Sequence, residues 1–164
     1  MPLILILNPP METTTWSQRI DQSRLTRRLT SLFDASGCPE DSEATLVLTD
    51  DEEVHALNKE YRDVDSPTDV LAFSMLEGED AEFAGPLLGD VIISVETAER
   101  QAETQEHQRR LEEPEGAPWT LDDELAFLAI HGFLHLLGHD HYEPEEEAAM
   151  KAEEQRLWAI VREA

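Results

Sequence analysis

Four short apolar segments along the chain predict the strands of a small sheet. The first is a continuous apolar run at residues 3–7, bounded by Asn8, Pro9 and Pro10, and such a run is typical of a buried strand. The predicted strands are residues 3–7, 45–49, 70–73 and 87–95.

Helical patterns lie between and after these strands, where apolar residues recur every three or four positions. The predicted helices are residues 17–33, 50–61, 96–111, 120–137 and 144–161. The fourth is apolar almost all round from Leu125 to Leu137, so we expect it to be the central, buried helix. Strands interleaved with helices on a small sheet predict an α+β or mixed α/β single domain.

The charge of the chain is strongly negative. Asp and Glu number 37 against 12 Lys and Arg, so the net charge is −25 and the sequence pI is about 4.3. This is the opposite of a typical nucleic-acid-binding composition, whose pI exceeds about 9, and it argues against adhesion to anionic membranes. Hydrophobic residues still make up 40% of the chain, which excludes a disordered polyanion.

The cysteine content and the absence of a long apolar segment predict a cytoplasmic protein. Cys38 is the single cysteine and has no partner for an internal disulfide, which fits a reducing compartment. The apolar run at residues 3–7 is too short for a signal peptide or a membrane span. No membrane partner is therefore expected.

Four of the six histidines lie within eleven residues, and their spacing predicts a metal site. His131 and His135 are four positions apart, so they lie on one face of the predicted helix. Gly138 ends that helix and lets the chain reverse, which brings His141 towards the first two. The spacing H-x-x-x-H-x-x-G-x-x-H is that of metzincin-type zinc sites. Three imidazoles leave a fourth coordination position open, as catalytic zinc sites do.

Several neighbouring polar residues have two interpretations. His139 is a further candidate ligand, although the spacing favours His141. Asp140 either orients a ligand through a hydrogen bond or serves the turn. His55 and His107 lie on polar predicted helices, so we expect them at the surface.

The residue after the first histidine argues against a peptidase. Zinc peptidases with the H-E-x-x-H motif place a glutamate there as general base. Here the position is Gly132, which cannot accept a proton. The chain therefore has the histidines of such a site without the acid that a peptidase uses.

Three blocks of the chain resemble the YbeY-type endoribonucleases, a bacterial family of ribosomal-RNA maturation factors. The first block is HGFLHLLGHDH at residues 131–141. The second combines LNKEYR at 57–62 with PTDVLAF at 67–73, and the third is LGDVIIS at 88–94. Two positions depart from the commonest form of the family, since His139 stands where Tyr is frequent and Ala72 where Ser is frequent.

The resemblance implies a fold and a site. Residues 1–164 would form one metal-dependent hydrolase domain, a small mixed four-stranded sheet with about five helices and the metal-binding helix at its centre. One zinc ion would be held by His131, His135 and His141, and Arg62 would act in the cleft as a functional arginine. The implied function is a single-strand-specific endoribonuclease in ribosome biogenesis, which processes the ends of small-subunit ribosomal RNA and takes part in ribosome quality control. Its partners would be precursor RNA and the small subunit or its proteins.

The hypothesis that follows is metal-assisted cleavage of an RNA phosphodiester bond. The zinc ion activates a water or polarises a phosphoryl oxygen, and Arg62 offsets charge on the phosphoryl oxygens. Without the resemblance, Arg62 is better explained as a helix-end cation paired with Asp63 or Asp65. Thr68 and Asp69 either line the cleft or serve a turn. The sequence does not identify the general acid.

Two other function classes are open. One is a zinc-dependent peptidase-like hydrolase, favoured by the ligand spacing and disfavoured by Gly132. The other is a ribosome-associated binding module whose metal is structural.

The distribution of positive charge predicts which face binds RNA. Half of the twelve cations lie between residues 19 and 62, and on the RNA hypothesis they form the binding face, with the carboxylates on other surfaces. These cations are Arg19, Arg24, Arg27, Arg28, Lys59 and Arg62.

Overall fold

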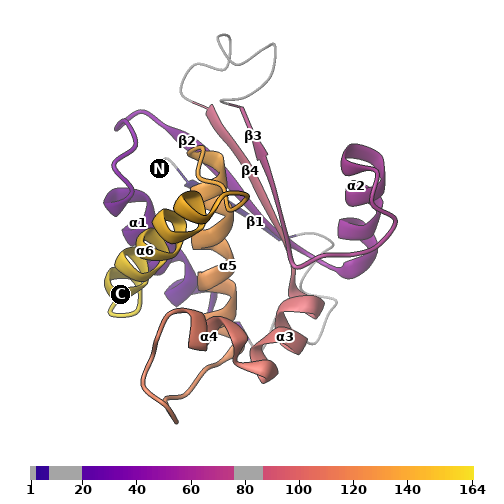
Figure 1. Ribbon diagram of the computed structural model, residues 1–164. Helices are drawn as coiled ribbons and strands as arrows, with labels where there is room; N and C mark the ends of the chain where they lie inside the picture. The colour runs from indigo at the N-terminus through magenta and orange to yellow at the C-terminus, as the bar shows by residue number, and fades with distance from the viewer. Residues whose placement is uncertain (1–2, 8–19, 76–86) are drawn as a thin grey trace.

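The computed structural model describes residues 3–7, 20–75 and 87–164, in which a four-stranded sheet carries helices on both sides (Figure 1). The strands are β1 (Leu3–Leu7), β2 (Glu43–Thr49), β3 (Val70–Ser74) and β4 (Leu87–Ser94). Their order in the sheet is β1-β2-β4-β3. The pairs β1–β2 and β2–β4 are parallel, and β3 runs antiparallel to β4 along the edge. The predicted mixed α/β class and small mixed sheet are confirmed.

The described residues form six helices, one more than the sequence predicts. They are α1 (Gln22–Ala35), α2 (Asp51–Arg62), α3 (Val95–Thr104), α4 (Glu106–Arg110), α5 (Leu121–Leu136) and α6 (Pro144–Val161). Figure 1 shows α2 on one side of the sheet and α1, α5 and α6 on the other. None of these helices combines the length and the apolar character needed to cross a membrane.

Two helix boundaries differ from the prediction for local reasons. The first helix begins at Gln22 because the Asp21 side chain caps it by accepting from the Arg24 N–H, and residues 17–19 of the predicted helix lie outside the described residues. The single helix predicted over 96–111 is two helices. Gln105, with φ of 56°, ends α3 in the left-handed region and redirects the chain into α4.

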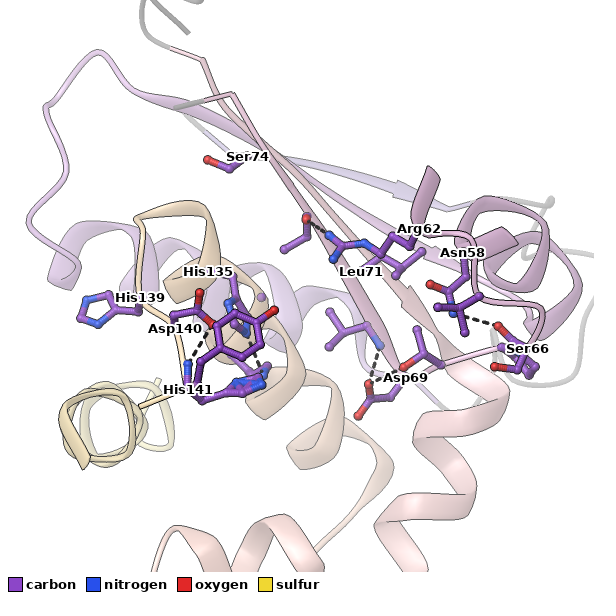
Figure 2. A pocket seen from close by; sticks show the side chains of 18 residues that line it. Asn58, Arg62, Ser66, Asp69, Leu71, Ser74, His135, His139, Asp140 and His141 are labelled. Atoms are coloured by element: carbon purple, nitrogen blue, oxygen red, sulfur yellow. Dashed lines mark hydrogen bonds between the residues drawn. The ribbon is translucent and has the colours of Figure 1, made fainter. Parts of the chain in front are cut away.

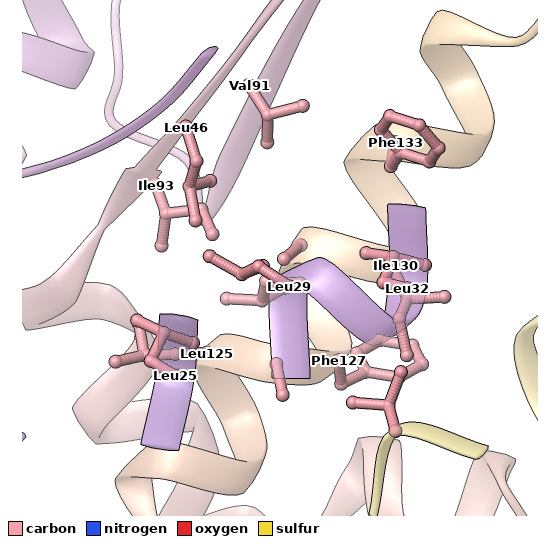
Figure 3. Close-up of a cluster of buried hydrophobic side chains, with 14 of the residues drawn as sticks. Leu25, Leu29, Leu32, Leu46, Val91, Ile93, Leu125, Phe127, Ile130 and Phe133 are labelled. Carbon is pink, nitrogen blue, oxygen red and sulfur yellow. The ribbon is translucent and has the colours of Figure 1, made fainter. Parts of the chain in front are cut away.

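The apolar helix α5 is the centre of the core, as predicted (Figure 3). It packs on β3 and β4 and against α1, α3 and α6. Thr120 and Asp123 form a capping box at its start, where each side chain accepts from the other residue's backbone N–H. Its side chains Leu125, Ile130 and Leu134 are at most 1% exposed, and burying each contributes about 1.5–3 kcal/mol.

The glycine at position 132 is required by how closely α5 approaches the sheet. A Cβ atom there would lie 2.6 Å from Cγ1 of Val91 on β4 and 3.1 Å from Cγ2 of Val70 on β3. No real Cβ contact is as short as the first of these distances. A glutamate after His131 is therefore excluded by packing as well as absent from the sequence.

We predict that Gly132→Ala destabilises the protein by about 1–3 kcal/mol, because overpacking against Val91 outweighs the better helix propensity of alanine. Urea unfolding measures the change. In a Val91→Ala background, which removes both contacting methyl groups of Val91 and leaves only the longer contact with Val70, the same substitution should cost much less. Equal costs in the two backgrounds would contradict the packing explanation.

Candidate metal centre

The three predicted histidines converge in the structure. His131 and His135 stand one turn apart on α5, which ends at Leu136. Gly138 follows with φ of 97°, a conformation that favours glycine, and the chain turns back so that His141 approaches from the loop. One ring nitrogen from each of His131, His135 and His141 lies within 4.8 Å of the other two. Figure 2 shows His135 and His141 side by side at the pocket.

The donor set and its spacing fit a single metal ion. Nε2 of His135 lies 3.2 Å from Nε2 of His131. Two nitrogens that bind one tetrahedral zinc ion at about 2.0–2.1 Å lie about 3.3 Å apart, so these two rings are already at the separation that zinc requires. The His141 ring centroid is 5.3 Å from that of His135 and 6.0 Å from that of His131.

Burial favours the neutral, ligating form of the central ring. Desolvation lowers the pKa of His135, and the neighbouring His131 and His141 lower it further. Asp140 and the backbone of His139 act in the opposite direction but do not outweigh these effects. The neutral imidazole is the form that binds metals.

Two other polar residues of this loop, His139 and Asp140, lie outside the three-histidine group. Asp140 accepts the backbone N–H of His141 at 2.9 Å, so it serves the turn, and the structure gives it no hydrogen bond to a ligand ring. His139 lies outside the three-histidine group and points away from it in Figure 2.

A cavity of about 560 Å³ opens in front of the histidines. Its lining includes His131, His135 and His141 and, from the edge of the sheet, Thr68 and Asp69, which the sequence placed either there or in a turn. Asp69 does both, because its carboxylate also accepts the Val70 N–H at 2.7 Å.

Arg62 lies at the C-terminal end of α2 and lines the same cavity (Figure 2). Its Nη2 donates to the carbonyl of Ala72 at 2.5 Å, and its guanidinium carbon lies 5.3 Å from the centroid of the Phe73 ring. Among the described residues it forms no ion pair, so the alternative pairing with Asp63 or Asp65 is not what holds it. The guanidinium is fixed by a backbone oxygen and an aromatic face, so in the described part of the chain no carboxylate pairs with its charge.

The predicted cationic face is wrong. Arg28 is 2% exposed and donates to Asp123 at 3.0 Å, because its position on α1 faces the core. Arg24 and Arg27 also lie on α1, which contributes nothing to the cavity lining. Arg19 lies outside the described residues. Of the five cations that the structure describes, only Arg62 lines the cavity.

A buried carboxylate behind His131 was missed by the sequence analysis. Glu154 of α6 is 0% exposed, and its Oε2 lies 3.2 Å from Nδ1 of His131. Arg110 of α4 donates to Glu154 from Nε at 2.9 Å and from Nη2 at 2.6 Å. Burial raises the pKa of Glu154, but hydrogen bonds from His131 and Arg110 outweigh burial, so the pKa is lowered overall.

His107 was wrongly expected at the surface. Its side chain is 17% exposed, its ring stacks on Phe127 at 4.3 Å between centroids, and Nδ1 lies 2.5 Å from the fully buried Glu124 of α5. It lines a second cavity of about 330 Å³, which also touches His131 and His141. The available signal was Glu124 itself, an acid on an otherwise apolar helix that requires a buried partner.

Comparisons with known proteins identify the family of the chain. The family model described as "Endoribonuclease YbeY" matches residues 11–162. The chain belongs to this family. Proteins named Endoribonuclease YbeY from Heliobacterium modesticaldum and Pelotomaculum thermopropionicum are 48% and 44% identical to it. The first alignment covers 72% of this chain and 69% of the relative, and the second covers 81% of each.

Two more distant matches support the family and the fold, respectively. The YbeY protein of Bacillus subtilis is 39% identical over 127 residues, 74% of this chain and 73% of the relative. The solution structure of the Thermotoga maritima protein TM1509 superposes with a TM-score of 0.55 over 98% of this chain and 92% of that one. Its identity is 22%, so it supports the fold alone.

We predict that the His107–Glu124 pair makes stability depend on pH. Burial lowers the pKa of His107, but the hydrogen bond and charge of Glu124 outweigh it, so the pKa lies above the ordinary 6.5. The pair therefore contributes fully below the unfolded-state pKa, and its contribution is lost as the pH rises through the folded-state pKa. The gap in unfolding free energy between the wild type and His107→Gln should be larger at about pH 5.5 than at about pH 9.

Urea unfolding with a chelator present measures this gap without interference from metal. In a Glu124→Gln background the carboxylate is absent and burial of His107 remains, so the His107→Gln gap should no longer be larger at about pH 5.5 than at about pH 9. A gap in the wild-type background that stays constant with pH would refute the ion-pair explanation.

Proposed function

We propose that the chain is a zinc-dependent, single-strand-specific endoribonuclease that acts in the cytoplasm in ribosomal RNA maturation, on the ends of small-subunit RNA, and in ribosome quality control. Residues 1–164 act in this proposal as one metal-dependent hydrolase domain. The observation that carries the proposal is the convergence of His131, His135 and His141 on one cavity that also holds Arg62, whose charge has no ion-pair partner among the described residues. Membership of the YbeY family supports the substrate class.

The three imidazoles would hold the zinc ion. A bound zinc ion supplies Lewis acidity, which polarises a phosphoryl oxygen or lowers the pKa of water. The chain's own contribution is to hold the three ring nitrogens at ligand spacing on one helix and its following turn. The same cavity gives a single RNA strand access to them.

Arg62 would bind the phosphoryl oxygens of the scissile bond. The guanidinium presents a planar array of N–H donors that matches these oxygens. One donor is engaged with Ala72, and the Phe73 face restricts the rest of the group to one orientation. Negative charge that develops on the phosphoryl group would therefore meet a fixed cation that needs no reorganisation.

Two observations disfavour the other function classes. A peptidase that uses the H-E-x-x-H mechanism needs a carboxylate where Gly132 packs against Val91. A structural zinc site is closed by four protein ligands. The group found here, within the described residues, has three and faces a cavity.

Partners beyond the RNA follow from the proposed role. We propose the small ribosomal subunit or its proteins as the partner that delivers precursor RNA. Because the chain carries a net charge of −25, long-range attraction to RNA is not available, and delivery by a partner would compensate for this.

We predict that His135→Ala loses both the metal and the RNA cleavage activity, because two imidazoles do not hold zinc at a site with this geometry. Metal content by mass spectrometry and cleavage of a single-stranded RNA oligonucleotide measure the two losses. The circular dichroism spectrum should change little. Full cleavage by a metal-free His135→Ala protein would refute the site, and unfolding of the wild type by a chelator would favour the structural-metal alternative.

We predict that Arg62→Ala lowers the cleavage rate about 10²–10³-fold with zinc content unchanged, because one preorganised donor to the reacting group is lost. Arg27→Ala is the matched control, since it removes an exposed cation from α1, which contributes nothing to the cavity. It should leave the rate unchanged. Equal rates for Arg62→Ala and the wild type would remove Arg62 from the mechanism.

A further inference from the structure

Glu154 combines two properties that are costly to combine. It is fully buried, on the face of α6 that also buries Met150, Leu157 and Trp158, and it carries a charge. A buried carboxylate is tolerated only when it is paired and hydrogen-bonded. Both of its oxygens are engaged, Oε1 by Arg110 and Oε2 by His131.

The hydrogen bond to His131 determines where the imidazole proton lies. A carboxylate can only accept hydrogen bonds, so Nδ1 of His131 must be the donor. In the neutral ring the other nitrogen, Nε2, then carries the lone pair. That nitrogen is the one that lies 3.2 Å from Nε2 of His135, inside the three-histidine group.

We propose that Glu154 is a positioning residue that fixes His131 in the Nδ1–H tautomer, with its Nε2 lone pair directed at the metal site, and that Arg110 holds the carboxylate in place for this purpose. The inference deepens the proposed function, since it concerns the same metal centre. Carboxylates that orient ligating histidines typically change metal affinity about 10–100-fold when they are removed.

Arg110 binds one oxygen of this carboxylate more closely than the other. Its Nε and Nη2 donate to Oε1 of Glu154 at 2.9 and 2.6 Å, whereas Oε2 receives only a longer contact from Nε at 3.3 Å, and Nη1 donates to Glu147 at 2.5 Å. Arginine has no acceptor, so whatever side chain stands at position 154 must turn an oxygen towards it. The atom left facing His131 is therefore decided by the chemistry of residue 154.

Glu154→Gln uses this asymmetry. The glutamine must give its oxygen to Arg110 and turn its NH₂ group to His131, where it can only donate. His131 must then accept at Nδ1 and carry its proton on Nε2, which blocks the nitrogen that faces the metal site. We expect the His131 tautomer to reverse in the metal-free protein and zinc to bind about 10–100-fold more weakly.

Two measurements test this. Long-range ¹H–¹⁵N correlation spectra of the imidazoles, on metal-free protein at about pH 8.5, where histidine is neutral, report the tautomer. Competition with a chromophoric chelator reports the zinc affinity. Glu153→Gln is the matched control, because Glu153 precedes Glu154 on the same helix but pairs with Arg156 at 2.8 Å. It should change neither quantity.

Glu154→Asp separates positioning from stability. It keeps a carboxylate, which can only accept, so His131 should remain in the Nδ1–H tautomer even if the shorter side chain lowers the unfolding temperature. An unchanged tautomer in Glu154→Gln, or zinc affinity equal to that of Glu153→Gln, would overturn the proposal and leave Glu154 with a structural role alone. Because the tautomer is read without metal, failure of the wild type to bind zinc would refute the proposed function and leave this test intact.

Discussion

The polar groups on the buried helix α5 constrain the arrangement of everything around it. The helix is enclosed by the sheet and by α1, α3 and α6, yet one of its faces carries Glu124, His131 and His135. Each of these groups loses its hydration on folding, so each needs a protein partner or, for the histidines, a metal. His107 and Arg110 of α4, three residues apart, provide two of the partners, one directly and one through Glu154 of α6. A helix of only five residues thereby has a fixed place against two longer ones.

The same constraint fixes the positions of His131 and His135. His131 and His135 project from a helix whose other faces are locked into the core, as Figure 3 shows for Ile130 and Phe133. The close contact of Gly132 with Val91 sets the distance of that helix from the sheet, and thus the distance of the histidines from Arg62, which reaches the cavity from α2 across the edge strand β3. Ligands placed on a packed helix keep their geometry better than ligands placed on loops.

Structural features could be predicted from the sequence when the pattern that indicates them lies within one short segment of the chain. The strands were predicted because each is a short apolar run, and the central helix and the three histidines because their spacing is visible along a single segment. The partners of those residues were not predicted, because the sequence around Glu154 does not indicate that this residue lies behind His131 in the fold. The burial of Glu154 had a signal, since Met150, Glu154, Leu157 and Val161 recur at helical spacing and share the buried face. Only the structure identified which group the glutamate meets. The split at Gln105 and the burial of Arg28 were missed for a similar reason, since both depend on packing between elements.

The ion pairs show how several of the few cations in this acidic chain are used. Six of the cations in the described part of the chain are engaged by carboxylates: Arg28, Arg100, Arg110, Lys151, Arg156 and Arg162. Their charges hold helices and loops together and are not available to a polyanion. Arg62 differs, because a carbonyl and an aromatic ring fix it without neutralising it. The net charge of −25 therefore repels a polyanion at long range, whereas Arg62 presents a positive charge at the cavity itself. This difference between Arg62 and the six paired cations depends on which side chains the fold brings together, so net charge alone does not reveal it.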